Sequence, residues 1–204
     1  METKIVETNE YLTAADYLNN GQVICFPTET VYGIGVICNK EDSYKELIKI
    51  KGRAPDKPIS LMAASLKDAL PYLKLNDKQL KLAKKFYPGE VTFLFNAADN
   101  IDSWIDLKTG VVGLRVPSSE FVNNLLKNVN KPCLVTSANI SGQITSTKFD
   151  ETYNTFAGLV PLIVKGECVS NVASTIVDLT KEKPILIRQG VLEFDKILEA
   201  WEEE

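Results

Sequence analysis

The 204-residue sequence contains no histidine. This absence excludes the Ser-His-Asp and Cys-His arrangements of nucleophilic catalysis, histidine zinc sites and imidazole acid–base catalysis. An enzyme without these groups works by positioning its substrates and stabilising charge, which is the mode of phosphoryl and nucleotidyl transfer.

Several other signals are also missing. No apolar run reaches the ~20 residues of a membrane span, and the N-terminus lacks the basic-then-apolar layout of a secretory signal. There is no P-loop, no G-x-G-x-x-G after a strand and no clear metal cluster. The four cysteines (25, 38, 133 and 168) form no C-x-x-C pair, which favours reduced, mostly buried thiols in a cytoplasmic protein.

The charge balance is mildly acidic. Lysine and arginine number 23 against 27 aspartates and glutamates, a net charge of −4. This argues against a general nucleic-acid coat, although it allows a local basic cleft. No repeat or low-complexity linker divides the chain, so we predict a single domain over residues 1–204.

Hydrophobic patterning predicts strands and helices that mix along the whole chain. The expected fold class is therefore α/β (α+β), with one twisted, open, mixed sheet flanked by helices. Apolar runs predict strands at 23–26, 59–62, 91–95, 111–116, 133–135, 162–164, 175–178 and 185–187. Caps and periodicity predict helices at 12–20, from Asn39 to about 50, after Ser65, from Asn76 to about 86, after Ser119, at 149–156 and from about 192.

A basic segment at 51–58, K-G-R-A-P-D-K-P, stands just before a predicted strand. Glycine and two prolines keep its three cations, Lys51, Arg53 and Lys57, off one regular helix face. Cations on a stiff loop at the mouth of a strand suit a bound polyanion such as a nucleotide triphosphate. A solvated surface loop is the simpler interpretation of this segment taken alone.

Three predicted strands end in the same polar chemistry. The strand at 23–26 leads to Thr28 and Thr30, the strand at 133–135 to Ser137 and Asn139, and the strand at 185–187 to Arg188. Open α/β sheets bind ligands at such strand ends. Each loop alone also has a structural explanation, because hydroxyls and amides close turns and cap helices.

Seven short blocks occur in order from residue 23 to residue 190. They are P-T-E-T-V-Y-G at 27–33, K-G-R at 51–53, P-G-E-V-T at 88–92, G-L-R-V-P at 113–117, S-A-N-I-S-G at 137–142, S-T-I-V-D at 174–178 and I-R-Q-G at 187–190. Together they resemble the YrdC family, the threonylcarbamoyl-AMP synthases, in its short, single-domain form.

The resemblance implies a twisted open sheet with a basic concave pocket. It also implies a reaction of L-threonine, bicarbonate and ATP that gives threonylcarbamoyl-adenylate and pyrophosphate, for modification of tRNA. Mg²⁺ would travel mainly on the ATP phosphates. The implied partner is the tRNA threonylcarbamoyl-transferase complex that receives the adenylate, with only weak contact to tRNA itself.

The resemblance and the chemistry of the side chains together suggest which residues form the site. We expect Lys51 and Arg53 to be catalytic. The expected ATP-binding residues are Lys51, Arg53, Lys57, Thr92, Ser137, Asn139, Thr145 and Arg188. The expected threonine-binding residues are Thr30, Tyr32, Arg115, Val135 and Ser174.

Two other functions remain open. The basic segment could serve a tRNA- or double-stranded-RNA-binding module without catalysis, although the net charge of −4 weighs against this. YrdC-like domains also occur in hydrogenase-maturation carbamoyltransferases, whose amine acceptor is not threonine. The absence of an acylphosphatase or zinc-finger segment in the sequence weighs against this function.

Overall fold

The computed structural model describes residues 1–54 and 56–203, and its strands join into one mixed sheet. The strand order is β1-β9-β2-β3-β8-β4-β7-β6-β10-β11, and β5 pairs with β6 outside this path. The strands are β1 (Lys4–Glu7), β2 (Ile24–Phe26), β3 (Gly33–Ile37), β4 (Ser60–Met62), β5 (Leu73–Lys74), β6 (Val91–Ala97), β7 (Val111–Arg115), β8 (Cys133–Ser137), β9 (Leu162–Lys165), β10 (Thr175–Asp178) and β11 (Ile185–Arg188). The sheet contains both parallel and antiparallel pairs, so the mixed α/β class expected from the sequence is confirmed.

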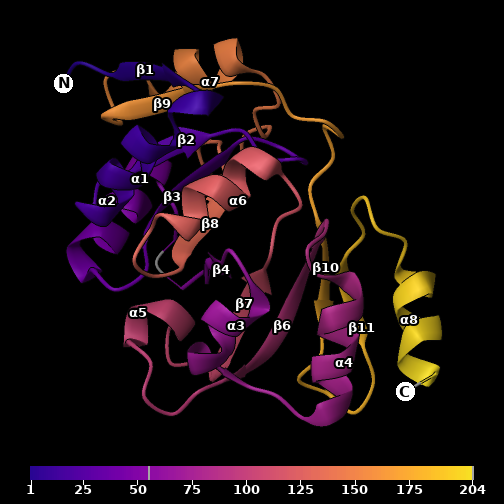
Figure 1. The fold of residues 1–204 in the computed structure, drawn as a ribbon. Helices are drawn as coiled ribbons and strands as arrows, with labels where there is room; N and C mark the ends of the chain where they lie inside the picture. Colours follow the sequence, from indigo (N-terminus) through magenta and orange to yellow (C-terminus); the bar gives the residue numbers. More distant parts are fainter. Residues whose placement is uncertain (55, 204) are drawn as a thin grey trace.

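Helices cover both faces of this sheet (Figure 1). They are α1 (Tyr11–Asn19), α2 (Glu41–Lys51), α3 (Leu66–Ala69), α4 (Asp77–Phe86), α5 (Ser103–Asp106), α6 (Glu120–Lys127), α7 (Phe149–Phe156) and α8 (Phe194–Glu202), with 3₁₀ turns η1 (Thr8–Glu10) and η2 (Leu70–Tyr72). The N-terminus lies beside β1 at one end of the sheet, and α8 packs on α4 at the other. No helix of the described residues has the length and apolar character needed to cross a bilayer.

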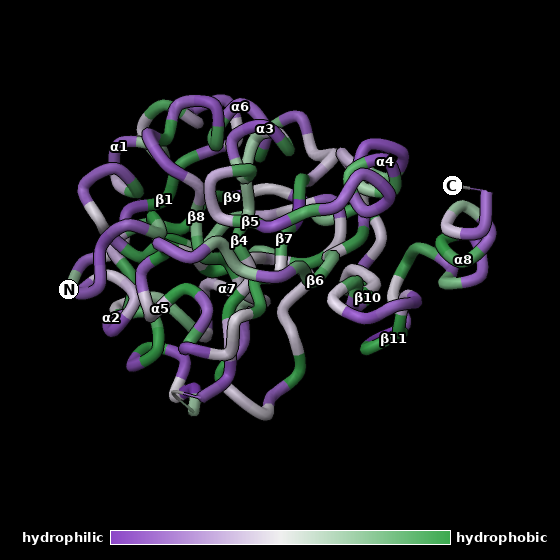
Figure 2. Tube along the Cα trace, turned by 90° about the horizontal axis from the view of Figure 1, so that it is seen from below, coloured by the Kyte–Doolittle hydropathy of each residue, from purple (hydrophilic) through white to green (hydrophobic). Residues whose placement is uncertain are grey.

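The core is divided by the sheet into two layers. Along β2, Ile24 and Phe26 pack with α1 and α6, whereas Cys25 packs on the other side with α2 residues such as Leu47. Because both faces of the central strands are buried, their sequences are continuous apolar runs. Figure 2 shows these runs in green along the inner strands, with purple, hydrophilic segments over the outer helices.

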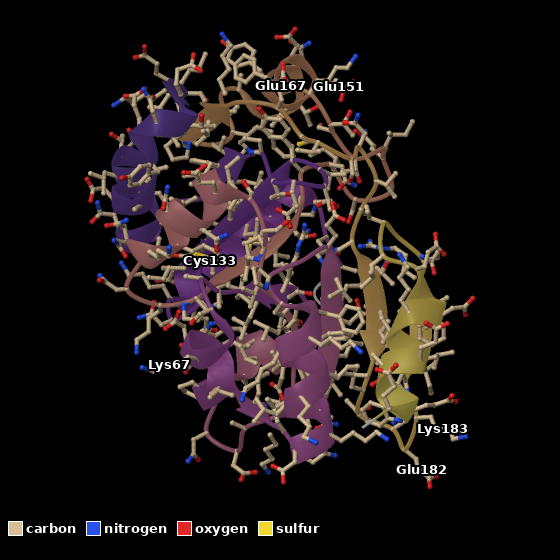
Figure 3. The ribbon with its side chains drawn as sticks, turned by 45° about the vertical axis from the view of Figure 1, so that its right-hand side comes forward. Lys67, Cys133, Glu151, Glu167, Glu182 and Lys183 are labelled. Carbon is tan, nitrogen blue, oxygen red and sulfur yellow. The ribbon has the colours of Figure 1, made fainter. Side chains whose placement is uncertain are left out.

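The predicted caps and thiols are largely confirmed. The side chains of Ser65, Asn76 and Ser119 each accept a backbone N–H in the first turn of the helix that follows. All four cysteines are free thiols, three of them buried, and Cys133 lies in the interior while Glu182 and Lys183 point outward (Figure 3). Burial raises the pKa of the Cys133 thiol well above its ordinary value.

Some element predictions were wrong or incomplete. Helix α2 begins at Glu41 without a side-chain cap, so Asn39 does not cap it as predicted. The sequence pattern predicts no strand over residues 33–37, but these residues form β3, the buried neighbour of β2 and β8. A Cβ on Gly35 would lie 2.8 Å from Val135 Cγ2 and 3.0 Å from the Leu134 carbonyl oxygen, so the glycine permits close pairing rather than a turn. The sequence pattern also missed β1, β5 and the short α5.

Candidate active site

The loops that follow the predicted strands meet around one cavity of about 230 Å³. Thr28 reaches it from beyond β2, Ser137 from the end of β8 and Arg188 from the end of β11. These three strand ends therefore meet at one cavity. Thr28 itself mainly closes a local turn: its Oγ1 donates to the Val31 carbonyl oxygen at 2.7 Å and accepts the N–H of Thr30 at 3.1 Å.

All three arginines of the chain line this cavity: Arg53, Arg115 and Arg188. None of the described residues that line it is acidic. Guanidinium groups remain charged at any physiological pH and offer planar forks of donors, which match phosphate and carboxylate oxygens. The cavity therefore suits an anionic ligand, although the chain as a whole is acidic.

Backbone carbonyls hold two of these arginines in place. Arg53 donates from Nε to the Lys57 carbonyl oxygen at 3.0 Å and from Nη2 to that of Pro58 at 2.8 Å. Arg188 donates from Nε and Nη2 to the Ser174 carbonyl oxygen, at 3.1 and 2.8 Å. Burial lowers the pKa of both groups, and the nearby charge of Arg115 lowers the pKa of Arg188 further.

Arg115 is held by a buried ion pair. Its Nη2 lies 2.7 Å from Glu29 Oε1 and donates to Thr30 Oγ1 at 2.8 Å. The backbone N–H of Ser118 donates to the same Glu29 oxygen at 3.1 Å. Arg115 Nε and Glu29 Oε2 are buried and have no hydrogen-bond partner among the described residues. The pair fixes the guanidinium at the cavity wall, while the Nε–H of Arg115 has no partner among the described residues.

Hydroxyl groups complete the wall near β6 and β10. The hydroxyls of Thr92 and Ser174 share a buried hydrogen bond of 3.0 Å, and both residues line the cavity. Tyr32 and Val135 also line it. The Tyr32 hydroxyl donates to the Gly166 carbonyl oxygen at 2.8 Å, so its polar end is already used to anchor the segment after β9.

Lys51 lies behind this wall. Its ammonium donates to the Ser137 and Asn139 carbonyl oxygens at 2.6 and 2.7 Å, and the residue is 1% exposed. Asn139 Oδ1 in turn accepts from Ser137 Oγ at 2.6 Å.

The structure thus gathers most of the predicted site residues, but not all of them at the surface of the cavity. Eight of them line it: Arg53, Thr92, Ser137, Arg188, Tyr32, Arg115, Val135 and Ser174. Thr30, Lys51 and Asn139 lie one layer behind and contact lining residues. Lys57 is exposed and Thr145 partly buried, and neither lines the cavity.

Glu29 is a site residue that sequence reasoning did not identify. It stands within the P-T-E-T-V-Y-G block, where it is 6% exposed. One signal in the sequence could have identified it: Glu29 follows a strand that is predicted to be buried. A buried carboxylate is nearly always paired with a cation, so this position predicts a basic partner. Its partner Arg115 is 86 residues away in the sequence.

Comparison with known proteins identifies the relationship. A sequence model of the Sua5/YciO/YrdC family, described as "Telomere recombination", matches residues 16–190. The chain belongs to this family.

Members of the Sua5/YciO/YrdC family resemble the chain over most of its length. The threonylcarbamoyl-AMP synthase of Pyrococcus abyssi is 32% identical over 186 residues, which are 90% of this chain but 55% of that protein. The threonylcarbamoyl-AMP synthase of Vibrio campbellii is 29% identical over 85% of this chain and 95% of its own length. The crystal structure of P. abyssi Sua5 complexed with L-threonine superposes with a TM-score of 0.92 at 30% identity, over 97% of this chain and 61% of that one.

Proposed function

We propose that this protein is a threonylcarbamoyl-AMP synthase. The observation that carries the proposal is the convergence of all three arginines on one cavity, in a chain of the Sua5/YciO/YrdC family. L-threonine, bicarbonate and ATP react to give L-threonylcarbamoyl-adenylate, pyrophosphate and water. The threonine amine first takes up CO₂ from bicarbonate as a carbamate. A carbamate oxygen then forms a bond to the α-phosphorus of ATP while the bond from that phosphorus to the pyrophosphate oxygen breaks.

This chemistry suits a protein without histidine, because no protein nucleophile is required. The protein must align two anions and stabilise the charge that builds up on the phosphorus and on the departing pyrophosphate. We assign that task to Arg53 and Arg188, whose forks are already oriented by backbone carbonyls. Ser137 and Thr92 would direct neutral donors at phosphate oxygens. Mg²⁺ would arrive with the ATP phosphates as part of the substrate.

Threonine would occupy the side of the cavity near Arg115. The Arg115 guanidinium, which lines the cavity, suits the substrate carboxylate. The Ser174 hydroxyl lines the same cavity, while Thr30 holds Arg115 from behind. Val135 supplies an apolar wall for the methyl group. A methyl in an apolar pocket adds only ~1–3 kcal/mol, so discrimination against serine would be modest.

Asn139, Lys57 and Thr145 complete the ATP-binding set that we proposed from the sequence. Asn139 acts through Ser137, which donates to it. Lys57 and Thr145 would have to approach the nucleotide from outside the present cavity wall. We further propose that the protein acts in the cytoplasm, that it passes the adenylate to a tRNA threonylcarbamoyl-transferase complex, and that its own contact with tRNA is weak.

The decisive experiment measures pyrophosphate release from Mg²⁺-ATP, with and without L-threonine and bicarbonate. We expect release only when both are present, and its loss in Arg53→Ala with Lys183→Ala as an exposed control. Release with threonine alone in carbonate-free buffer would indicate plain amino-acid adenylation. No release at all, with salt-sensitive binding of tRNA, would instead support the RNA-binding module.

A further inference from the structure

Every donor of the Lys51 side chain is committed to the protein itself. Its Nζ donates to the Ser137 carbonyl oxygen at 2.6 Å, to the Asn139 carbonyl oxygen at 2.7 Å and, more weakly, to Asn139 Oδ1 at 3.5 Å. An ammonium group has three N–H donors, so these acceptors account for all of them. No donor remains for a phosphate unless one of these contacts breaks.

The main chain of Lys51 holds the same loop at a second point. Its carbonyl oxygen accepts the N–H of Ser141 at 2.9 Å. Lys51 is the last residue of α2, and the left-handed Gly52 that follows it stops the helix there. The C-terminal end of α2 is therefore hydrogen-bonded to residues 137–141 at several points. We call the contacts of Lys51 with Ser137, Asn139 and Ser141 the Lys51 brace.

Within the loop, Asn139 is turned inward as well. Its Oδ1 accepts from Ser137 Oγ at 2.6 Å, and its Nδ2 donates to the carbonyl oxygens of Ile140 and Gln143 at 2.9 and 3.0 Å. Of the residues held by the Lys51 brace, Ser137 is the one that lines the cavity. The brace thus fixes a cavity-facing hydroxyl from behind.

We propose that Lys51 is a positioning residue that holds the 137–141 loop, and that the cations contacting substrate phosphates are Arg53 and Arg188. The inference rests on the proposed function and departs from the sequence-based expectation that Lys51 touches the substrate. It divides the K-x-R pair into two tasks: the lysine organises the loop and the arginine faces the ligand.

The pKa of Lys51 should make the strength of the Lys51 brace depend on pH. Burial, and to a smaller extent the charge of Arg53, lower the pKa of Lys51 to about 8. The titratable and charged groups that act on Lys51 are Arg53, on the loop after α2, and the thiol of Cys25 on β2, which burial keeps protonated. Above this pH the neutral amine has only two N–H donors and turns a lone pair toward a carbonyl oxygen, so the brace weakens.

Hydrogen exchange on the substrate-free protein tests the brace directly. The variants are Lys51→Met and, as a matched control, Lys49→Met, because the Lys49 side chain lies on the same helix and is 80% exposed. We expect the amides of residues 138–143 to exchange at least about tenfold faster in Lys51→Met, the effect of losing charge-assisted hydrogen bonds, and to be unchanged in Lys49→Met. In the wild type, exchange of these amides, corrected for its intrinsic pH dependence, should accelerate between pH 7 and pH 9.

Pyrophosphate release then connects the brace to turnover. We expect kcat/KM to fall by about a hundredfold in Lys51→Met, with the decline of the wild-type rate above pH about 8 absent from the variant. Unchanged loop exchange together with lost turnover would show that Lys51 contacts the substrate, and would overturn the proposal. A loosened loop with full turnover would overturn it equally.

Two further comparisons allow the role of Lys51 to be decided even if the variant does not fold or the wild type is inactive. If Lys51→Met does not fold, Lys51→Gln, which keeps two N–H donors, and the wild-type pH series decide the same question. If the wild type releases no pyrophosphate, the proposed function fails, whereas the exchange data still report whether Lys51 holds the loop.

Discussion

Removing one partner of the buried pair of Glu29 and Arg115 should destabilise the protein strongly, because the remaining charge stays buried without compensation. Both side chains are more than nine-tenths buried, and Glu29 Oε1 lies 2.7 Å from Arg115 Nη2. In Glu29→Met the guanidinium remains buried without its counter-ion, and the Ser118 N–H also loses its acceptor. Removing one partner of such a pair costs about 3–5 kcal/mol of unfolding free energy.

Urea unfolding followed by the fluorescence of Trp104 and Trp201 measures this cost. With an m-value of about 2 kcal/mol/M, the midpoint should move down by roughly 2 M. The control is Lys74→Met, because the Lys74–Asp99 pair is more than half exposed and its loss should cost less than about 1 kcal/mol.

The double variant Glu29→Met/Arg115→Met separates charge pairing from packing. Replacing both ions by apolar side chains removes the uncompensated charge, so we expect most of the lost stability to return. Pyrophosphate release should not return, since Arg115 would be absent from the cavity wall. The reasoning is refuted if Glu29→Met costs less than about 1 kcal/mol, or if the double variant is destabilised by the sum of the two single changes.

Three further predictions concern other parts of the molecule. Arg188→Lys keeps the charge but loses the two-pronged contact with the Ser174 carbonyl, so kcat/KM for pyrophosphate release should fall by about 10–100-fold in steady-state assays. Gly35→Ala should lower the unfolding free energy in urea by about 1–3 kcal/mol, because the added Cβ would press on Val135. The Cys133 thiol stays protonated in the fold but ionises in the unfolded chain above pH 9.0, so stability should fall as pH rises beyond this value; Cys133→Ala should remove about 1.4 kcal/mol per pH unit of that fall.

Each of these has an outcome that contradicts it. Full turnover in Arg188→Lys would mean that charge alone suffices at this position. An unchanged urea midpoint in Gly35→Ala would mean that β3 and β8 can move apart to admit the methyl group without loss of unfolding free energy. Parallel pH curves for Cys133→Ala and the wild type, compared between pH 8 and pH 10.5, would mean that the thiol is not protected by burial.

Much of the fold could be predicted because local signals and tertiary structure agree. Helix α7 has the predicted bounds, and the caps at Ser65, Asn76 and Ser119 follow from side chains that satisfy free N–H groups within one turn. Strand β3 was missed because glycine normally weakens a strand, and only the approach of Val135 from a strand about 100 residues away explains Gly33 and Gly35. The order of the strands depends on such long-range pairings throughout.

For the candidate site, the sequence indicated which segments meet but not which way their side chains face. Lys51 and Arg53 are two residues apart, yet one donates to backbone carbonyls behind the wall while the other lines the cavity. Local spacing could not distinguish them, because the acceptors of Lys51 lie on the 137–141 loop. Glu29 was overlooked for the same reason, since its partner becomes visible only when β7 is placed.

The position of β9 between β1 and β2 affects how the chain reaches this structure during synthesis. Strand β9 pairs in parallel with both β1 and β2, but it is made roughly 135 residues after β2. At ribosomal rates of about 5–20 residues per second, the apolar strand Ile24–Phe26 waits on the order of 10 s for this neighbour. On the nascent chain β2 can therefore pair early with β3 on one side only. Its other edge stays open to aggregation until β9 is made, unless other parts of the chain or chaperones cover it.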